Sequence, residues 1–196
     1  MDIFMCCCVV IFIFTKIIKF NQVRMKFNGQ VCSFDDNALY WELHIPIPEN
    51  VFSTLVELAK DKRVVCTLNR DFSFHCAMLP KGTFHYILLN RAICKKLNLH
   101  LNDDVEVELV KDESKYGMPL SEEMHEVLFS DPEGSDLFHQ LTPGKQRTLI
   151  HVVNKYKSSQ LRIEKSFVIL EHLKSRKGVL DFKGLNEDFK NFNKNF

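Results

Sequence analysis

The chain has 196 residues, of which 45% are hydrophobic and 26% are charged, with seven glycines and six prolines. This composition excludes a disordered or fibrous chain, and the length allows one domain or two small ones. The net charge of +1 argues against a protein devoted to nonspecific nucleic-acid binding. Two opposed blocks lie within this average: residues 112–140 carry a net charge of −7 and residues 141–196 a net charge of +7.

Residues 1–24 form a hydrophobic extension. The run from Ile3 to Phe14 is apolar, but its twelve residues fall short of the roughly 20 that a spanning helix needs. Asp2 precedes this run and no small-residue cleavage site follows it, so a secretory signal is not indicated. We interpret the extension as an early start codon, with translation beginning at Met25 in a cytoplasmic protein. The alternative is a membrane tether through residues 3–14, acylated on its cysteine triplet.

A mostly β domain is predicted over residues 25–112. Runs rich in β-branched and aromatic residues predict strands at 25–34, 39–48, 63–69, 72–79, 82–90 and 103–111, and short helices are expected at 48–60 and 91–99. An offset of 42 residues aligns two strand–helix–strand pieces, for example Ile45 with Ile87 and Val65 with Val107. This repeat indicates a β-barrel made of two similar halves, which would remove exposed sheet edges.

A helical domain is predicted over residues 121–196, after a polar linker at 113–120. Three helix starts are marked by Ser121 before two glutamates, by Asp131-Pro132 and by Thr142-Pro143. A fourth helix is expected from about Gln160 to Lys174, since apolar residues there recur at helical spacing.

Neither a metal nor a cofactor is predicted. The seven cysteines include no C-x-x-C pair, which argues against a disulfide framework and a zinc ribbon. The donors nearest to a zinc set are His44, His75, His85, Cys66 and Cys76. Because side chains alternate between the two faces of a strand, these donors scatter over both faces.

Several strings resemble a bacterial family from Met25 onward. They are FHCAMLPKG, LNRAICKKLNL, DDVEVELVKDESKYGMP, LFHQLTPGKQRTLI and RIEKSFVILEHLK. The chain resembles proteins that join a domain of unknown function, number 1905, to a YdeI/OmpD-associated (OmdA-like), bacteriocin-protection domain. The resemblance implies an α+β fold, with a double-split barrel of the AbrB/MazE type before an all-helical domain. It implies a link to bacteriocin or envelope stress, but it assigns no reaction and no catalytic residues.

The T-P-G-K-Q-R string is the main candidate site. It places Thr142, Gly144, Lys145 and Arg147 at a helix start, where free backbone N–H groups favour anions. Gly144 would let a ligand approach the backbone closely. The alternative is that Thr142 and Pro143 only start the helix, while the two cations face water or the acidic segment 122–136.

Together these features predict a non-catalytic binding protein that acts in bacteriocin or envelope-stress protection, through a protein partner or a small anionic ligand. Neither a G-x-S-x-G elbow nor a Gly-rich phosphate loop is present, which weakens the enzyme class. One alternative is a DNA-binding regulator built on the AbrB-like barrel. Another is an enzyme with a small-molecule pocket between barrel and helices, lined by Tyr40, Trp41 and His75.

Overall fold

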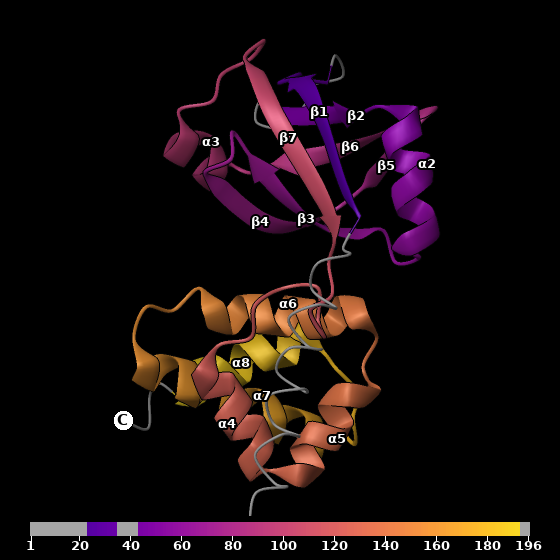
Figure 1. Cartoon of the computed structure of the whole chain (residues 1–196). Helices are drawn as coiled ribbons and strands as arrows, with labels where there is room; N and C mark the ends of the chain where they lie inside the picture. Colours follow the sequence, from indigo (N-terminus) through magenta and orange to yellow (C-terminus); the bar gives the residue numbers. More distant parts are fainter. Residues whose placement is uncertain (1–22, 35–42, 193–196) are drawn as a thin grey trace, which may run out of the picture. The chain divides into compact units, whose positions relative to one another are not determined.

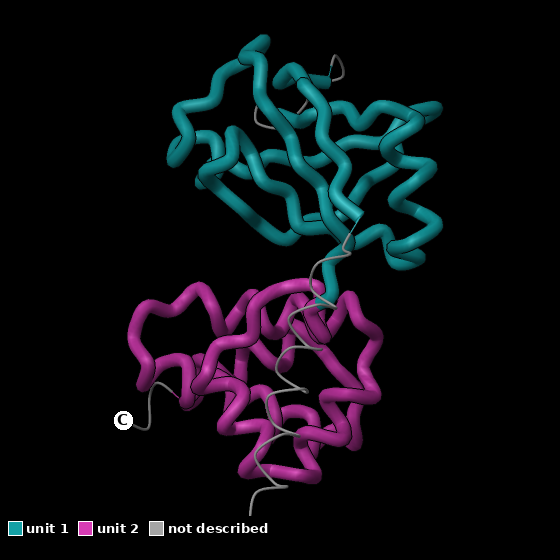
Figure 2. The backbone as a smooth tube through the Cα atoms, in the orientation of Figure 1, with its two compact units in different colours: residues 1–113 teal, residues 114–196 magenta. Residues whose placement is uncertain are grey.

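The computed structural model describes residues 23–34 and 43–192 of the chain. The chain divides into two compact units, residues 1–113 and residues 114–196, which Figure 2 shows in different colours. Each has its own cluster of buried hydrophobic side chains, and we refer to them as unit 1 and unit 2. None of the described helices combines the length and the apolar character needed to cross a membrane.

The described part of unit 1 forms two antiparallel sheets and two helices (Figure 1). Sheet A has the order β1 (Arg24–Gln30), β7 (Asp104–Lys111), β3 (Arg63–Leu68), β4 (Phe72–Ala77). Sheet B has the order β2 (Leu43–Ile47), β6 (Phe84–Leu89), β5 (Leu79–Lys81). The helices are α2 (Glu49–Leu58) and α3 (Arg91–Leu97).

The alternating pattern of the strands sets which face of sheet A is buried. On β7, Val105, Val107 and Leu109 are buried, whereas Glu106 and Glu108 between them point to the other face. The buried side chains of β3 are Val64, Cys66 and Leu68. Sheet A therefore packs one face on the core of unit 1 and carries polar side chains on the other.

The two aligned pieces have the same order of elements. They are β2-α2-β3 and β6-α3-β7, as the 42-residue offset predicted, and the equivalent strands pair with each other. Ile45 lies directly opposite Ile87 in the register of β2 and β6. The internal repeat is therefore an arrangement of paired strands and not only a likeness of sequence.

The prediction of a closed barrel is wrong for the residues described here, because their seven strands form two separate sheets. After β1 the chain passes from one sheet toward the other. The backbone N–H of Val31 donates to the carbonyl of Asp103, beside sheet A, and Cys32 forms an isolated bridge with His44 of β2. A single bridge does not make a continuous ladder, so the sheets stay open.

Unit 2 is helical. Its helices are α4 (Glu122–Ser130), α5 (Pro132–Gln140), α6 (Pro143–Asn154), α7 (Ser159–Ser175) and α8 (Phe182–Phe192). The predicted starts are confirmed: Ser121 accepts a hydrogen bond from the N–H of Met124, Asp131 accepts one from the N–H of Gly134, and α6 begins at Pro143. The helix expected at about 160–174 is α7, which packs against α4, α5, α6 and α8 (Figure 1). The segment expected to be a linker contributes Tyr116 to the core of unit 2.

Two ion pairs join the acidic block of the sequence to the basic block. Arg162 of α7 donates to Glu123 of α4, with 2.8 Å between Nε and Oε2. Arg162, followed by Ser159, donates hydrogen bonds that lower the pKa of the Glu123 carboxyl to about 2. Lys174 of α7 lies 2.8 Å from Asp131 and lowers the pKa of that carboxyl. Both pairs hold α7 against the helices that precede it.

Candidate functional site

The predicted pocket residues fall partly outside the described chain. Tyr40 and Trp41 lie in the segment 35–42, which the structure does not describe. His75 lies on β4, and its Nδ1 is 2.7 Å from Oδ2 of Asp112, whose side chain is only 1% exposed. Since an ionised carboxylate only accepts hydrogen bonds, this contact assigns the proton to Nδ1 of His75.

The candidate zinc donors of the strands are spread over different places. Some lie on opposite faces of sheet A, and His85 packs against an aromatic ring of α2. Cys66 and Cys76 pack toward the core of unit 1, where a hydrogen bond with Cys76 and burial raise the pKa of the Cys66 thiol. His75 points to the other face of sheet A, because it precedes Cys76 on the same strand. His85 stacks on Phe52 of α2, with ring centroids 3.3 Å apart. In the described ranges, no three His, Cys, Asp or Glu side chains gather where a metal could bind.

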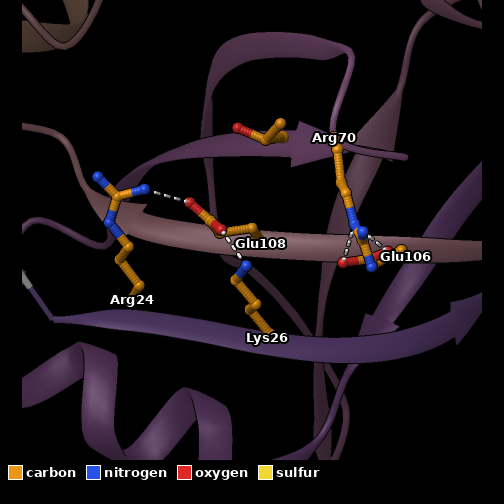
Figure 3. Close-up of a pocket in the computed structure, with 6 residues that line it drawn as sticks. Arg24, Lys26, Arg70, Glu106 and Glu108 are labelled. Carbon is orange, nitrogen blue, oxygen red and sulfur yellow. Dashed lines mark hydrogen bonds and ion pairs between the residues drawn. The ribbon is translucent and has the colours of Figure 1, made fainter.

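A groove of about 360 Å³ crosses the polar face of sheet A (Figure 3). Glu108 of β7 lies 3.0 Å from Arg24 and 3.0 Å from Lys26, both on β1. Glu106, two residues earlier on β7, lies 2.8 Å from Arg70. The hydrogen bond that Arg70 donates lowers the pKa of the Glu106 carboxyl. Each cation in this groove thus faces a carboxylate, and an incoming anion would have to displace that carboxylate first.

The start of α6 is open and carries two cations. The Thr142 side chain accepts no capping hydrogen bond from the first turn of α6. Apart from its chain neighbours and the backbone of α6, no described residue has an atom within 4 Å of the place that a Cβ at Gly144 would occupy. Lys145 is exposed and Arg147 is half-buried. Within the part of the chain that the structure describes, neither cation has an ion pair, so neither pairs with the acidic segment 122–136.

Gln146, which the sequence analysis missed, gives the T-P-G-K-Q-R string a structural role. Its side-chain amide lies 3.0 Å from the carbonyl oxygen of Leu141 and 3.1 Å from that of His139. A third carbonyl, that of Phe138, lies at 3.3 Å. These contacts help to satisfy the carbonyls where α5 ends, among which that of Phe138 also accepts from the N–H of Leu141. The string therefore fixes the turn between α5 and α6 through its glutamine, while its two cations stay available.

Replacing Gln146 by alanine is expected to destabilise unit 2 by about 1–2 kcal/mol, because half-buried carbonyls lose their donor. The replacement of the adjacent, exposed Lys145 by alanine is the matched control and should change stability by less than about 0.5 kcal/mol. Urea unfolding followed by circular dichroism measures both. Equal losses in the two variants would contradict the structural role of Gln146.

The R-I-E-K string is also structural. Arg162 bonds Glu123 and donates to the carbonyl of Tyr156 at 3.0 Å. Lys165 is only 2% exposed, and its ammonium lies 5.0 Å from the ring centroid of Phe189 and 5.8 Å from that of Tyr156. Both basic residues of this string therefore hold α7 in place.

A third cluster was not predicted from the sequence. Lys115 and Tyr116, in the segment before α4, both approach His139 near the end of α5. Their separation along the chain follows no helical or strand period, so no sequence pattern indicated this cluster. The fold alone brings these three side chains to one pocket of unit 2.

The fold and these sites define a class: a two-unit α+β protein, with paired charges on its β-rich unit and available cations on its helical unit. The family model described as a domain of unknown function, DUF1905, matches residues 27–109. The β-rich unit thus contains a DUF1905 domain, as the resemblance implied. Comparison with curated proteins gives no match.

Proposed function

We propose that this chain is a non-catalytic binding protein whose helical unit binds an anionic group at the start of α6. Thr142, Gly144, Lys145 and Arg147 would form the site, and the anionic group would belong to a small ligand or to a protein partner. One observation carries the proposal: Lys145 and Arg147 have no ion pair among the described residues, whereas Arg162 and Lys174 of the same unit do.

The physical basis is the positive end of a helix. The first N–H groups of an α-helix have no partner within the helix and attract anions. Pro143 contributes no N–H, so the groups on offer are those of Gly144 and Lys145. The open space at Gly144 lets an oxygen approach them, and the side chains of Lys145 and Arg147 add charge.

The biological setting is proposed on the resemblance. The DUF1905 match supports the first half of that resemblance. The assignment of unit 2 to the YdeI/OmpD-associated group, the AbrB-like ancestry of unit 1 and a role in bacteriocin or envelope-stress protection in the bacterial cytoplasm rest on the quoted strings alone. Function depends on the site and not on the family, so the binding site itself is tested.

The test is a calorimetric titration of the full chain with inorganic phosphate. Wild type should bind, and the double variant Lys145→Met, Arg147→Met should bind at least about tenfold more weakly, since charge-assisted hydrogen bonds are lost. Lys155→Met is the matched control, because Lys155 is an exposed cation at the other end of α6. It should bind phosphate as wild type does.

Two outcomes would contradict the proposal. One is phosphate affinity that is equal in wild type and in the double variant. The other is binding of duplex DNA that falls steeply with salt and survives both substitutions, which would favour the DNA-binding regulator.

A further inference from the structure

Unit 2 has a pocket of about 330 Å³ formed by α4, α5 and the segment that precedes α4. Its lining includes the apolar side chains of Leu128 and Phe129 of α4. Phe129 is 80% exposed, which makes it the most exposed large hydrophobic side chain described in the protein. An aromatic ring at the rim of a pocket offers apolar area that a ligand would remove from water.

Polar side chains of the same lining converge on one ring nitrogen. Nδ1 of His139 lies 2.7 Å from the carbonyl oxygen of Ser135, which can only accept, so the proton is on Nδ1. Nε2 of His139 then accepts, and two donors reach it: the Tyr116 hydroxyl at 2.8 Å and the Lys115 ammonium at 3.1 Å. A neutral imidazole nitrogen has one lone pair, so it cannot fully satisfy both. The cluster has more donors than acceptors.

The surplus donor is a cation. Lys115 has three N–H groups, and its ammonium also lies 5.2 Å from the ring centroid of Tyr116. None of the ion pairs found among the described residues involves Lys115, although Asp136 lines the same pocket. The lining of the pocket therefore presents a positive charge that has no carboxylate partner among the described residues.

We propose that this pocket binds a small organic carboxylate with an aromatic or branched apolar body. The carboxylate takes the N–H groups of Lys115, which leaves Tyr116 as the single donor to His139 and removes the surplus. The apolar body packs against Leu128 and Phe129. A volume of about 330 Å³ suits a small molecule of this kind. The lining of this pocket includes none of the residues of the α6 site, so this inference does not depend on the function proposed above.

Asp136 distinguishes two kinds of carboxylate ligand, those that carry an ammonium group and those that do not. It lies three residues before His139 on α5, and its carboxylate can accept from a ligand ammonium group. A free amino acid would use both Lys115 and Asp136, whereas a simple carboxylate would use Lys115 alone. The two kinds of ligand are separated by comparing 3-phenylpropanoate with L-phenylalanine, which differ in the ammonium group.

The experiment is an NMR titration of the full chain with 3-phenylpropanoate, L-phenylalanine and the uncharged 3-phenylpropanol. At least one of the two carboxylates should bind saturably, and it should bind at least about tenfold more tightly than the alcohol. Lys115→Met keeps the apolar stem and removes the charge, and it should reduce carboxylate affinity by a similar factor. Lys115 is exposed, so this variant is expected to fold. Tyr116→Phe keeps the buried ring and removes one of the two donors to Nε2 of His139, so Lys115 is held by His139 and this variant should also bind the carboxylate more weakly than wild type does.

The control is Lys155→Met, an exposed cation at the end of α6 that belongs to neither proposed site, and it should bind the carboxylate as wild type does. The inference is overturned if neither carboxylate saturates, if the alcohol binds as tightly as the carboxylates, or if Lys115→Met binds as wild type does. If Lys145→Met lost binding and Lys115→Met kept it, the carboxylate would bind at the α6 site, and the inference would also be overturned. Because the α6 site is tested with phosphate and the double variant Lys145→Met, Arg147→Met, the two proposals fail by different measurements.

Discussion

Replacing Phe138 by alanine should destabilise unit 2 by about 4 kcal/mol, the usual cost of removing a fully buried aromatic side chain. Phe138 of α5 has no exposed surface, and its ring meets Tyr116 edge to face with centroids 6.1 Å apart. Alanine at this position would leave a cavity between α5 and the segment before α4. Urea unfolding followed by circular dichroism measures the loss.

Phe129→Ala is the matched control for that experiment, because it removes the same side chain from a site that is 80% exposed. Little apolar burial is lost there, so its stability should stay within about 0.5 kcal/mol of wild type. A Phe138 variant as stable as the Phe129 variant would contradict the core of unit 2 described above.

Gly134 and Gly144 should respond in opposite ways to the same substitution. A methyl group at Gly134 of α5 would lie 2.8 Å from Cβ of Leu170 on α7, and 2.7 Å from Oδ2 of Asp131. Both distances are below van der Waals contact, so Gly134→Ala is expected to cost about 2 kcal/mol through overpacking. At Gly144 nothing lies within 4 Å, and alanine should stabilise α6 by up to about 1 kcal/mol.

Thermal unfolding of the two alanine variants measures this contrast. Gly134→Ala should melt below wild type and Gly144→Ala at or above it. If Gly134→Ala were as stable as wild type, α5 and α7 could not pack as closely as the structure has them. The same Gly144 variant, titrated with phosphate, shows whether the open space at α6 is used by a ligand.

The local signals of the sequence predicted α4, α5, α6 and α7 but not α8. Ser121 and Asp131 cap helices through contacts three residues away, so the chain around each start contains all the needed information. The alternation on β7 likewise predicted which side chains are buried. Closure of the sheet could not be read in the same way, because alternation shows the face of a strand and does not show its partner.

The sites illustrate the same limit. Lys145 and Arg147 were found because a helix start is a local signal, and whether they bind an anion stays a prediction. Gln146 was missed because its partners depend on how the chain turns between α5 and α6. The contact of Tyr116 with His139 joins residues 23 positions apart, and no sequence period marks such a pair.

The place of β7 in sheet A governs the order in which unit 1 is assembled. β7 is the last strand of unit 1 along the chain, yet it lies between β1 and β3. Its contacts with β1 join distant positions, for example Arg24 and Glu108, which are 84 residues apart. During synthesis, β3 therefore has one unpaired edge, and β1 has no partner strand in sheet A, until β7 has left the ribosome. An unpaired strand edge beside apolar residues can pair with other chains. Nascent unit 1 is therefore most prone to aggregate in the interval before β7 has been synthesised.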